Sequence, residues 1–342
     1  MGADLPLDAL REHSFPLDSE PPNHPATLPP GPARSLGDAS VVGLGEATHG
    51  TRECFEQKHR LLRHLVVEHG FRTVAFEADA AAVTALDAFV RDGTPFSPTP
   101  ASAESALAEL DMWQWRTASV RDLLEWLRAF NDGRAARDQV RVRGVDLSTP
   151  AAPAGPLRAY LDSVDPDAVG SESLRRIADV TVPDDPDERE RVLDAAARAT
   201  AELRERLERS RERHEASVSA AAWHTARHLC RVVEQACEWA RVRHERPGPH
   251  PDGMAKRDRC MAENALRALA RDPGDGVAFW AHDGHVQRGT FDDGTVWEDA
   301  ETAGERLARE LGEEYRPVGF DFGRGAFRAV GADDGEVGTV EV

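Results

Sequence analysis

Short apolar runs alternate with amphipathic stretches along most of the chain. Residues 41–45 and 73–77 are almost continuously apolar, which is typical of strands that are buried on both faces. Between such runs, apolar residues recur at helical spacing, and Phe55, Leu62 and Leu65 fall near one face of a helix over 53–69. This alternation predicts an α/β fold, a mostly parallel sheet with helices on both faces.

The predicted elements follow one another regularly up to residue 153 and again after residue 250. Strands are expected at 41–45, 73–77, 140–145, 277–281 and 317–320, with a final strand at 326–330. Helices are expected at 53–69, 79–91, 116–132, 254–271 and 302–312. We therefore assign an α/β core to residues 38–153 and 251–342.

The segment 154–250 breaks this rhythm, because it contains no convincing strand. Densely charged helical patterns cover 187–214 and 217–245, and the prolines that follow end the second pattern. We interpret the segment as a long all-helical insertion, a cap that forms part of the active-site cleft. Residues 1–37 are rich in proline and acids and are expected to be an extended lead-in with a short helical turn.

Polar side chains stand where four of the predicted strands end. Taken strand by strand, they are Glu46 and His49, Glu77, Asp146, and His282 and His285. The carboxyl ends of parallel strands share one edge of a sheet, and ligands bind at that edge. The sequence therefore predicts one shared site there. An acid after a strand is also a common helix N-cap, and that simpler explanation fits Asp146 equally well.

Acids and histidines at one edge favour general-base activation of water, in which a carboxylate holds the imidazole in the required tautomer. His49 is the candidate base. Cys54 is an alternative nucleophile, although a cysteine at a helix start is more often passive packing. A metal site is a second alternative, but H-E-x-x-H is absent. His224 and His228 have helical ligand spacing, yet we expect them on a solvated face.

Lysine is rare in this chain, since Lys58 and Lys256 are the only two. Lys58 lies on the helix after the His49 loop, where a compact ammonium charge suits a polar site. Arg116, with Trp115 beside it, is a further candidate for substrate binding. Arg257 and Glu263, on one predicted helix, are also candidates for substrate binding. The simpler explanation for Glu263 is a surface ion pair with Arg259, which has the required spacing.

The net charge of the chain limits the classes of partner that it is expected to bind. Acids outnumber bases by 61 to 42, for a net charge of −19, which disfavours nucleic acids and anionic membranes. Many acids with almost no lysine suggest a halophilic source, and a GC-rich genome is the alternative explanation. Four scattered cysteines, no signal peptide and no apolar span favour a cytoplasmic location. The sequence leaves the oligomeric state open.

Several blocks of sequence resemble the erythromycin esterase-like hydrolases. The blocks keep the family order and run from "GEATHGT" at 45–51, "FEQKHRLLRHLVVEHGF" at 55–71 and "AFEAD" at 75–79 through "WRTASVRDLLEWLRAFN" at 115–131, "GVDL" at 144–147, "RDRCMAEN" at 257–264 and "AHDGH" at 281–285 to "LGEEYRPVGFDFGRGAF" at 311–327. Together they span about residues 38 to 330.

The resemblance implies a carboxylic ester hydrolase that cleaves macrolide lactones without a cofactor or metal, and hence a role in antibiotic resistance. It implies that His49 is the general base, that Glu46, Glu77, His282 and His285 complete the polar site, and that Lys58 is the expected basic residue. The family is broad, so an esterase or transferase acting on an acylated sugar, and a metal- or haem-binding module without hydrolysis, stay open. Asp283 stands where the family pattern has Asn, and its charge is expected to raise the pKa of the two flanking histidines.

Overall fold

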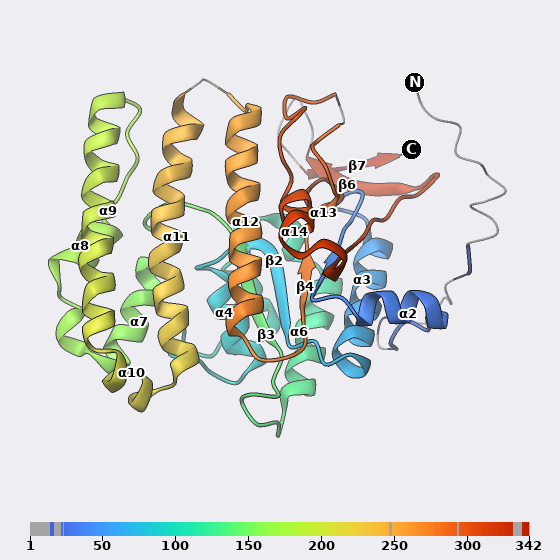
Figure 1. Cartoon of the computed structure of the whole chain (residues 1–342), viewed down its shortest axis with the longest axis horizontal. Helices are drawn as coiled ribbons and strands as arrows, with labels where there is room; N and C mark the ends of the chain where they lie inside the picture. The colour runs from blue at the N-terminus through green and yellow to red at the C-terminus, as the bar shows by residue number, and fades with distance from the viewer. Residues whose placement is uncertain are drawn as a thin grey trace.

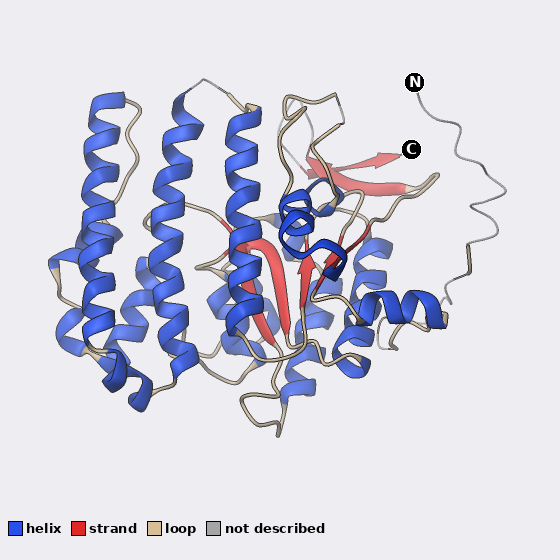
Figure 2. Ribbon diagram, in the orientation of Figure 1, coloured by secondary structure: helices blue, strands red, loops and turns tan. Residues whose placement is uncertain are grey.

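The structure is a computed structural model that describes residues 14–16, 22, 24–245, 248–292, 294–330 and 337–341. At its centre is a five-stranded sheet of β1 (Val41–Leu44), β2 (Thr73–Asp79), β3 (Arg141–Asp146), β4 (Val277–Trp280) and β5 (Tyr315–Val318). The strand order is β3-β2-β4-β1-β5, and every neighbouring pair is parallel. The predicted α/β fold with a parallel sheet is confirmed (Figures 1 and 2).

The strands send alternate side chains to two separate cores, as the twofold repeat of a strand requires. Val42, Val74 and Val142 pack under α3 (Arg52–Glu68), α4 (Val83–Val90) and α6 (Ala118–Asn131). Val41, Ala75 and Val145 pack on the other face, under α12 (Pro251–Arg271) and α14 (Ala303–Leu311). Apolar burial on both faces explains why these strands are nearly continuous apolar runs in the sequence. The shorter elements are α2 (Pro30–Gly37), α5 (Ala103–Leu107), α13 (Asp283–Val286) and the 3₁₀ turns Trp113–Trp115, Pro166–Ala168 and Gly312–Glu314.

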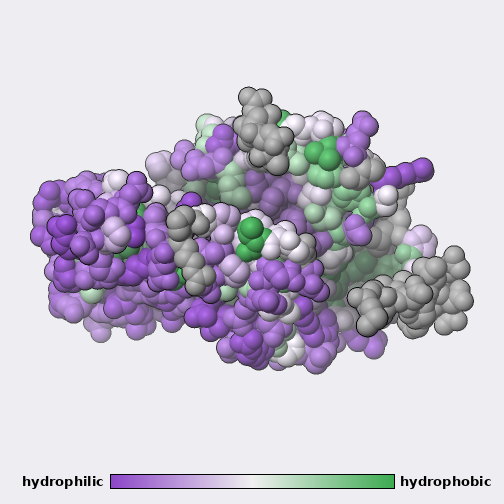
Figure 3. Space-filling model, turned by 90° about the horizontal axis from the view of Figure 1, so that it is seen from above, coloured by the Kyte–Doolittle hydropathy of each residue, from purple (hydrophilic) through white to green (hydrophobic). Residues whose placement is uncertain are grey.

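The helical segment has a hydrophobic core of its own. It contains α7 (Ala154–Val164), α8 (Glu172–Ala178), α9 (Pro186–Arg209), α10 (Arg211–Ser217) and α11 (Ala220–Glu245). Buried apolar residues of α7, α8, α9 and α11 form one cluster. α11 packs against α12, so the segment lies beside the sheet on the side of β3 (Figure 1). Seen from above, its outer surface is almost entirely hydrophilic (Figure 3). A cap function for 154–250 remains a prediction.

Some boundaries differ from the prediction. The strand expected at 317–320 is β5, which begins two residues earlier because Tyr315 pairs with Val41 and is fully buried. The helix expected at 79–91 begins only at Val83, since β2 continues to Asp79. The helix expected over 187–214 is interrupted at Ser210, which caps α9.

The strand expected at 326–330 exists as β6 (Ala326–Val330), but it lies outside the main sheet. It pairs antiparallel with β7 (Val337–Glu341), which the sequence did not predict. Of the expected lead-in, residues 1–13, 17–21 and 23 lie outside the described residues, and α2 ends the remainder. None of the helices in the described ranges combines the length and apolar character that crossing a bilayer requires.

Candidate active site

The four strands β3, β2, β4 and β1 are neighbours, and the predicted polar residues stand at their carboxyl ends. Glu77 and Asp146 belong to the last residues of β2 and β3, while Glu46 and His282 follow β1 and β4 by two residues. Glu46 and Glu77 are almost completely buried. The topology thus brings these four segments together at one edge, and hydrogen bonds join them into two connected clusters.

The first cluster joins Glu46, His49 and Lys58. His49 Nδ1 lies 3.0 Å from Glu46 Oε1, and Lys58 Nζ contacts the other carboxylate oxygen of Glu46. Lys58 Nζ also donates to the Ala281 carbonyl at 3.2 Å. The side chains of Glu46 and Lys58 are fully buried, whereas that of His49 is 31% exposed. The cluster therefore presents only the imidazole of His49 to a ligand.

The ring of His49 is set up as a proton acceptor. Because a carboxylate cannot donate, Nδ1 must carry the proton that it shares with Glu46, which leaves the lone pair on Nε2. Among the described residues, Nε2 has no hydrogen-bond partner. Burial lowers the pKa of His49 below its usual 6.5, and the charges of His285 and Arg257 act in the same direction against that of Glu77. His49 is therefore neutral at pH 7.

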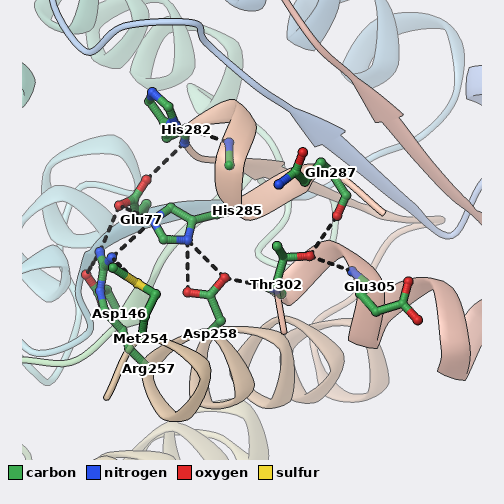
Figure 4. A network of polar contacts seen from close by, with 12 residues as sticks. Glu77, Asp146, Met254, Arg257, Asp258, His282, His285, Gln287, Thr302 and Glu305 are labelled. Carbon is green, nitrogen blue, oxygen red and sulfur yellow. Dashed lines mark hydrogen bonds and ion pairs between the residues drawn. The ribbon is translucent and has the colours of Figure 1, made fainter. Parts of the chain in front are cut away.

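Glu77 is the centre of the second cluster (Figure 4). Its Oε1 lies 2.7 Å from Arg257 Nη2 and 3.2 Å from His285 Nε2, and its Oε2 accepts the backbone N–H of His282 at 2.9 Å. Burial alone would raise the pKa of Glu77, but His285 and Arg257 hold it well below its usual range. Glu77 is therefore a buried, ionised carboxylate that ties β2 to β4 and α12.

Arg257 and Asp258, adjacent on α12, complete this cluster. Arg257 Nε donates to Asp146 Oδ1 at 2.9 Å, and His285 Nδ1 donates to Asp258 Oδ2 at 3.0 Å. Burial alone would lower the pKa of His285, but the carboxylates of Asp258 and Glu77 outweigh it and raise the pKa to about 10. We therefore treat His285 as an imidazolium held between two carboxylates.

His282 differs from both other histidines. Its Nδ1 accepts the backbone N–H of Gly284 at 3.1 Å, so Nε2 carries the proton and donates to the Ala47 carbonyl at 3.1 Å. Burial lowers its pKa to about 4. With both nitrogens bonded to the backbone, His282 caps α13 and holds the loop of His49, whose ring centroid lies 5.1 Å away.

The expected effect of Asp283 on its neighbours is wrong for His282, whose pKa falls instead of rising. Asp283 accepts the backbone N–H of Phe320 at 3.3 Å. The raised pKa of His285 has a different source, the carboxylates of Asp258 and Glu77. Asp283 therefore connects β4 to the chain after β5.

Three predicted binding residues lie away from these clusters. Trp115 is buried in the core, with its ring 5.1 Å from that of Phe76. Arg116 bonds the Leu110 carbonyl through two of its nitrogens, with Nε at 2.7 Å. Glu263 bonds Arg231 at 3.1 Å and Arg267 at 2.9 Å, so the expected pair with Arg259 is wrong.

The two alternative chemistries find little support in the geometry. Cys54 is buried, and burial raises the pKa of its thiol, which disfavours a thiolate nucleophile. Both ring nitrogens of His282 and His285 are in contact with protein atoms, which leaves His49 Nε2 as the one imidazole nitrogen of the site available to a ligand. Within the described ranges, no group of three His, Cys, Asp or Glu side chains is arranged to hold a metal ion.

A pocket of about 610 Å³ opens beside the second cluster. Arg257 forms part of its wall, together with Trp239, Met254 and Trp297. Arg243 and His244, at the end of α11, also line it. The pocket thus joins the helical segment to the sheet edge and combines aromatic with cationic surface, as small-molecule sites commonly do.

Sequence reasoning did not single out Asp258, although it lies inside the "RDRCMAEN" block. The sequence gives little indication of its role, because Asp258 lies in the middle of a helix and not at a strand end. Only the packing of α12 against α13 shows that it faces His285. Asp146, which was also explained as a plain helix cap, is an ion-pair partner of Arg257.

The sequence model of the erythromycin esterase family matches residues 66–342. The chain belongs to the erythromycin esterase family. The predicted resemblance is thereby confirmed. An Escherichia coli protein described as erythromycin esterase type II is 27% identical over 113 residues. That stretch covers 33% of this chain but only 24% of the relative's length.

Solved structures of this family's fold resemble the chain over most of its length. A Bacillus cereus protein is 24% identical with a TM-score of 0.76, covering 97% of this chain and 78% of that one. A succinoglycan biosynthesis protein is 19% identical with a TM-score of 0.77, covering 100% and 81%. A mutant of the erythromycin esterase EreC in its open conformation is 18% identical with a TM-score of 0.62, covering 90% and 77%. At these identities the likeness is one of fold.

Proposed function

We propose that this protein hydrolyses a carboxylic ester or lactone with a water molecule activated by His49. The observation that carries the proposal is the His49–Glu46 pair, in which a neutral, partly exposed imidazole has Nδ1 held by a buried carboxylate and Nε2 available. The family match begins at residue 66, beyond Glu46, His49 and Lys58, so their roles are argued from geometry alone.

The proposed reaction begins when water gives a proton to His49 Nε2 as its oxygen attacks the ester carbonyl. Glu46 stabilises the imidazolium that forms, as a buried carboxylate does in a histidine-based dyad. The tetrahedral intermediate then collapses, and His49 returns the proton to the leaving alcohol. One ester and one water become one acid and one alcohol, and the enzyme is unchanged.

Negative charge develops on the carbonyl oxygen and requires a donor. Arg257 is our candidate, because it lines the pocket and its Nη1 contacts no carboxylate in the described structure. Nη1 lies 3.0 Å from His285 Nε2, but a protonated His285 cannot accept a hydrogen bond from it. Lys58 is fully buried beneath Glu46 and does not reach a substrate, so we assign it a positioning role instead of the expected binding role. His285 holds Glu77, and through it Arg257, in place.

The pocket beside Arg257 favours a bulky substrate with apolar surface, since Trp239, Met254 and Trp297 line a volume of about 610 Å³. A macrolide lactone is the first candidate, by family. The structural likeness to a succinoglycan biosynthesis protein keeps an acylated carbohydrate as the second.

The test is hydrolysis of a macrolide, an acetylated sugar and a simple aryl ester by the full chain and by His49→Gln. We expect the variant to lose on the order of 10²–10⁴-fold in kcat/KM on any ester that is cleaved, the usual contribution of a general base. His64→Gln, on a half-exposed histidine of α3 that bonds His69, is the matched control and should stay within about twofold, since surface changes are mild. Equal turnover by His49→Gln and the unaltered chain would refute the assignment.

A further inference from the structure

A second cavity, of about 150 Å³, lies between α11, α12 and β3. It is lined by Arg271 at the last residue of α12, whereas Arg257 stands fourteen residues earlier on the same helix. A helix rises about 1.5 Å per residue, so this end of the cavity is roughly 20 Å from the proposed active site. The cavity is therefore a separate place on the molecule.

The lining is strongly cationic in a chain whose net charge is −19. Six arginines line it, namely Arg143, Arg204, Arg227, Arg231, Arg267 and Arg271. Asp272 is the one carboxylate among the lining residues. Because the molecule as a whole repels anions, an anion that binds here must be held by the cavity itself.

Carboxylates in and around the wall form ion pairs with most of these arginines. Asp87 and Asp272 pair with Arg143, Glu263 pairs with both Arg231 and Arg267, Glu234 and Glu238 also pair with Arg231, Glu234 pairs with Arg204, and Glu208 pairs with Arg227. Within the described ranges, Arg271 has no carboxylate at ion-pair distance. Its Nη1 instead bonds His224 Nδ1 at 2.8 Å, so Arg271 is a lining arginine without a carboxylate partner of its own.

Four buried polar atoms of lining residues make no hydrogen bond in the described structure. One of them, Arg227 Nε, lies 2.7 Å from Glu208 in an ion pair, and the other three have no partner of either kind. These three are Arg267 Nε, His228 Nδ1 and Asn264 Oδ1. Asn264 is 1% exposed, and its orientation is fixed because Nδ2 donates to the Val145 carbonyl at 2.9 Å. A buried polar atom without a partner costs stability, so a ligand that supplies partners is favoured. The solvated face expected for His228 is thus wrong, as it lines a cavity.

We propose that this cavity binds a small oxyanion that also carries a hydroxyl group, namely inorganic phosphate. Arg267 Nε–H and the guanidinium of Arg271 donate to the phosphate oxygens, as planar guanidinium groups do well. Asn264 Oδ1 accepts, and therefore requires a hydroxyl on the ligand. Phosphate keeps at least one such hydroxyl near pH 7, whereas sulfate and acetate have none.

The experiment is calorimetric titration of the full chain with phosphate, sulfate and acetate at fixed pH and ionic strength. We expect saturable, one-to-one phosphate binding that is tighter than binding of either other anion. Arg271→Gln and Arg267→Gln should each weaken phosphate binding by about tenfold, the value of one charge-assisted hydrogen bond. Arg137→Gln, whose side chain is 84% exposed and lies outside the cavity, is the matched control and should leave binding unchanged.

The thermal midpoint of each variant without ligand shows that it is folded. The proposal is overturned if the unaltered chain does not bind phosphate. It is also overturned if Arg271→Gln and Arg267→Gln both bind phosphate as tightly as the unaltered chain does. Either result would mean that water alone fills the cavity. Sulfate binding as tight as phosphate binding would overturn the requirement for a hydroxyl at Asn264. These outcomes are independent of whether the protein hydrolyses an ester.

Discussion

Three histidines stand at one edge of the sheet, and their partners give each a different state. His282 has both nitrogens bonded to backbone atoms and is neutral. His285 lies between Asp258 and Glu77 and carries a proton. His49 has a single bonded nitrogen and a lowered pKa, so it alone can accept a proton from water near pH 7. Residue type alone therefore does not identify the base; hydrogen bonding does.

The pH dependence of hydrolysis follows from these states. A general base must be unprotonated, and the pKa of His49 lies below 6.5, so kcat/KM should rise with pH along an acid limb whose midpoint is below 6.5. His285 helps to hold Glu77 and Arg257 and loses its proton at about pH 10, so activity should fall again there. A pH–rate profile of the esterase reaction from about pH 4 to 11 measures both limbs.

Asp258→Asn separates the two limbs of that profile. Removing this carboxylate takes away one of the charges that raise the pKa of His285, so the alkaline limb should move to lower pH while the acid limb stays in place. An acid limb centred at pH 7 or above in the unaltered chain would contradict the state assigned to His49.

Lys58 shows what composition can and cannot predict. A lysine in a chain that otherwise uses arginine indicated a special site, and the structure places it against the buried Glu46. With the side chain fully buried, a larger guanidinium would need space that the packing does not offer. The sequence could not show that Lys58 faces a carboxylate instead of a ligand, because that depends on how α3 packs against β1 and β4.

At the scale of elements, the parallel sheet explains why the site residues were predictable. Glu46, Glu77 and His282 come directly from strand ends, and the topology of such sheets brings strand ends together whatever the loops do. Asp258 is different, since it depends on the rotation of α12 about its axis. Trp115 was predicted to bind substrate because it lies beside Arg116, yet its ring packs in the core against Phe76. Whether a tryptophan lines a pocket or packs in the core depends on tertiary contacts that the local sequence does not show. The β6–β7 hairpin depends on a partner strand whose residues have no strong apolar pattern.

The glycines around His49 serve close packing rather than a sharp turn. Neither Gly45 nor Gly50 has a positive φ, so neither position requires the permissive backbone of glycine. A Cβ on Gly45 would lie 1.8 Å from Asp283 Oδ1, and a Cβ on Gly50 would lie 1.8 Å from the Arg328 carbonyl oxygen. The Gly50 carbonyl also accepts the Arg328 N–H at 3.3 Å, so β6 rests directly on the loop of the proposed base.

Gly50→Ala therefore should disturb catalysis more than stability. The added methyl group collides with the backbone of β6, so either the hairpin or the His49 loop must shift, and displacement of a catalytic group by about 1 Å can cost on the order of 10²-fold in rate. The two-stranded sheet lies outside the main cores, so the thermal midpoint should change little. Ester hydrolysis and thermal unfolding, measured on the same preparation, test both statements.

Gly338→Ala on β7 is the matched control, because nothing lies within 4 Å of its added Cβ. It should leave both the rate and the midpoint as they are. A fully active Gly50→Ala enzyme would show that contact between β6 and the His49 loop is unimportant for positioning the base.

At the scale of the whole molecule, the excess negative charge makes the stability of the fold depend on salt concentration. Two effects oppose each other: salt screens the repulsion among excess acids, which stabilises the fold, and it weakens surface ion pairs, which destabilises it. Exposed pairs such as Arg211–Glu215 contribute little individually, whereas 19 acids have no matching base. The buried pairs that hold the site, Lys58–Glu46 and Arg257–Glu77, are screened least.

We therefore expect KCl to stabilise this protein. The Debye length falls from about 10 Å at 0.1 M to about 3 Å at 1 M salt, so most of the repulsion should vanish within that interval and the thermal midpoint should rise steeply there and then level off. The sign follows from the imbalance of 61 acids against 42 bases. A titration of the midpoint with KCl, repeated near the isoelectric pH of about 5.1, provides the control, because at that pH the excess charge is gone and the rise should largely disappear. If the rise is equally large at both pH values, preferential exclusion of salt rather than charge screening stabilises the fold. The excess of acidic residues would then not be the cause of stabilisation by salt.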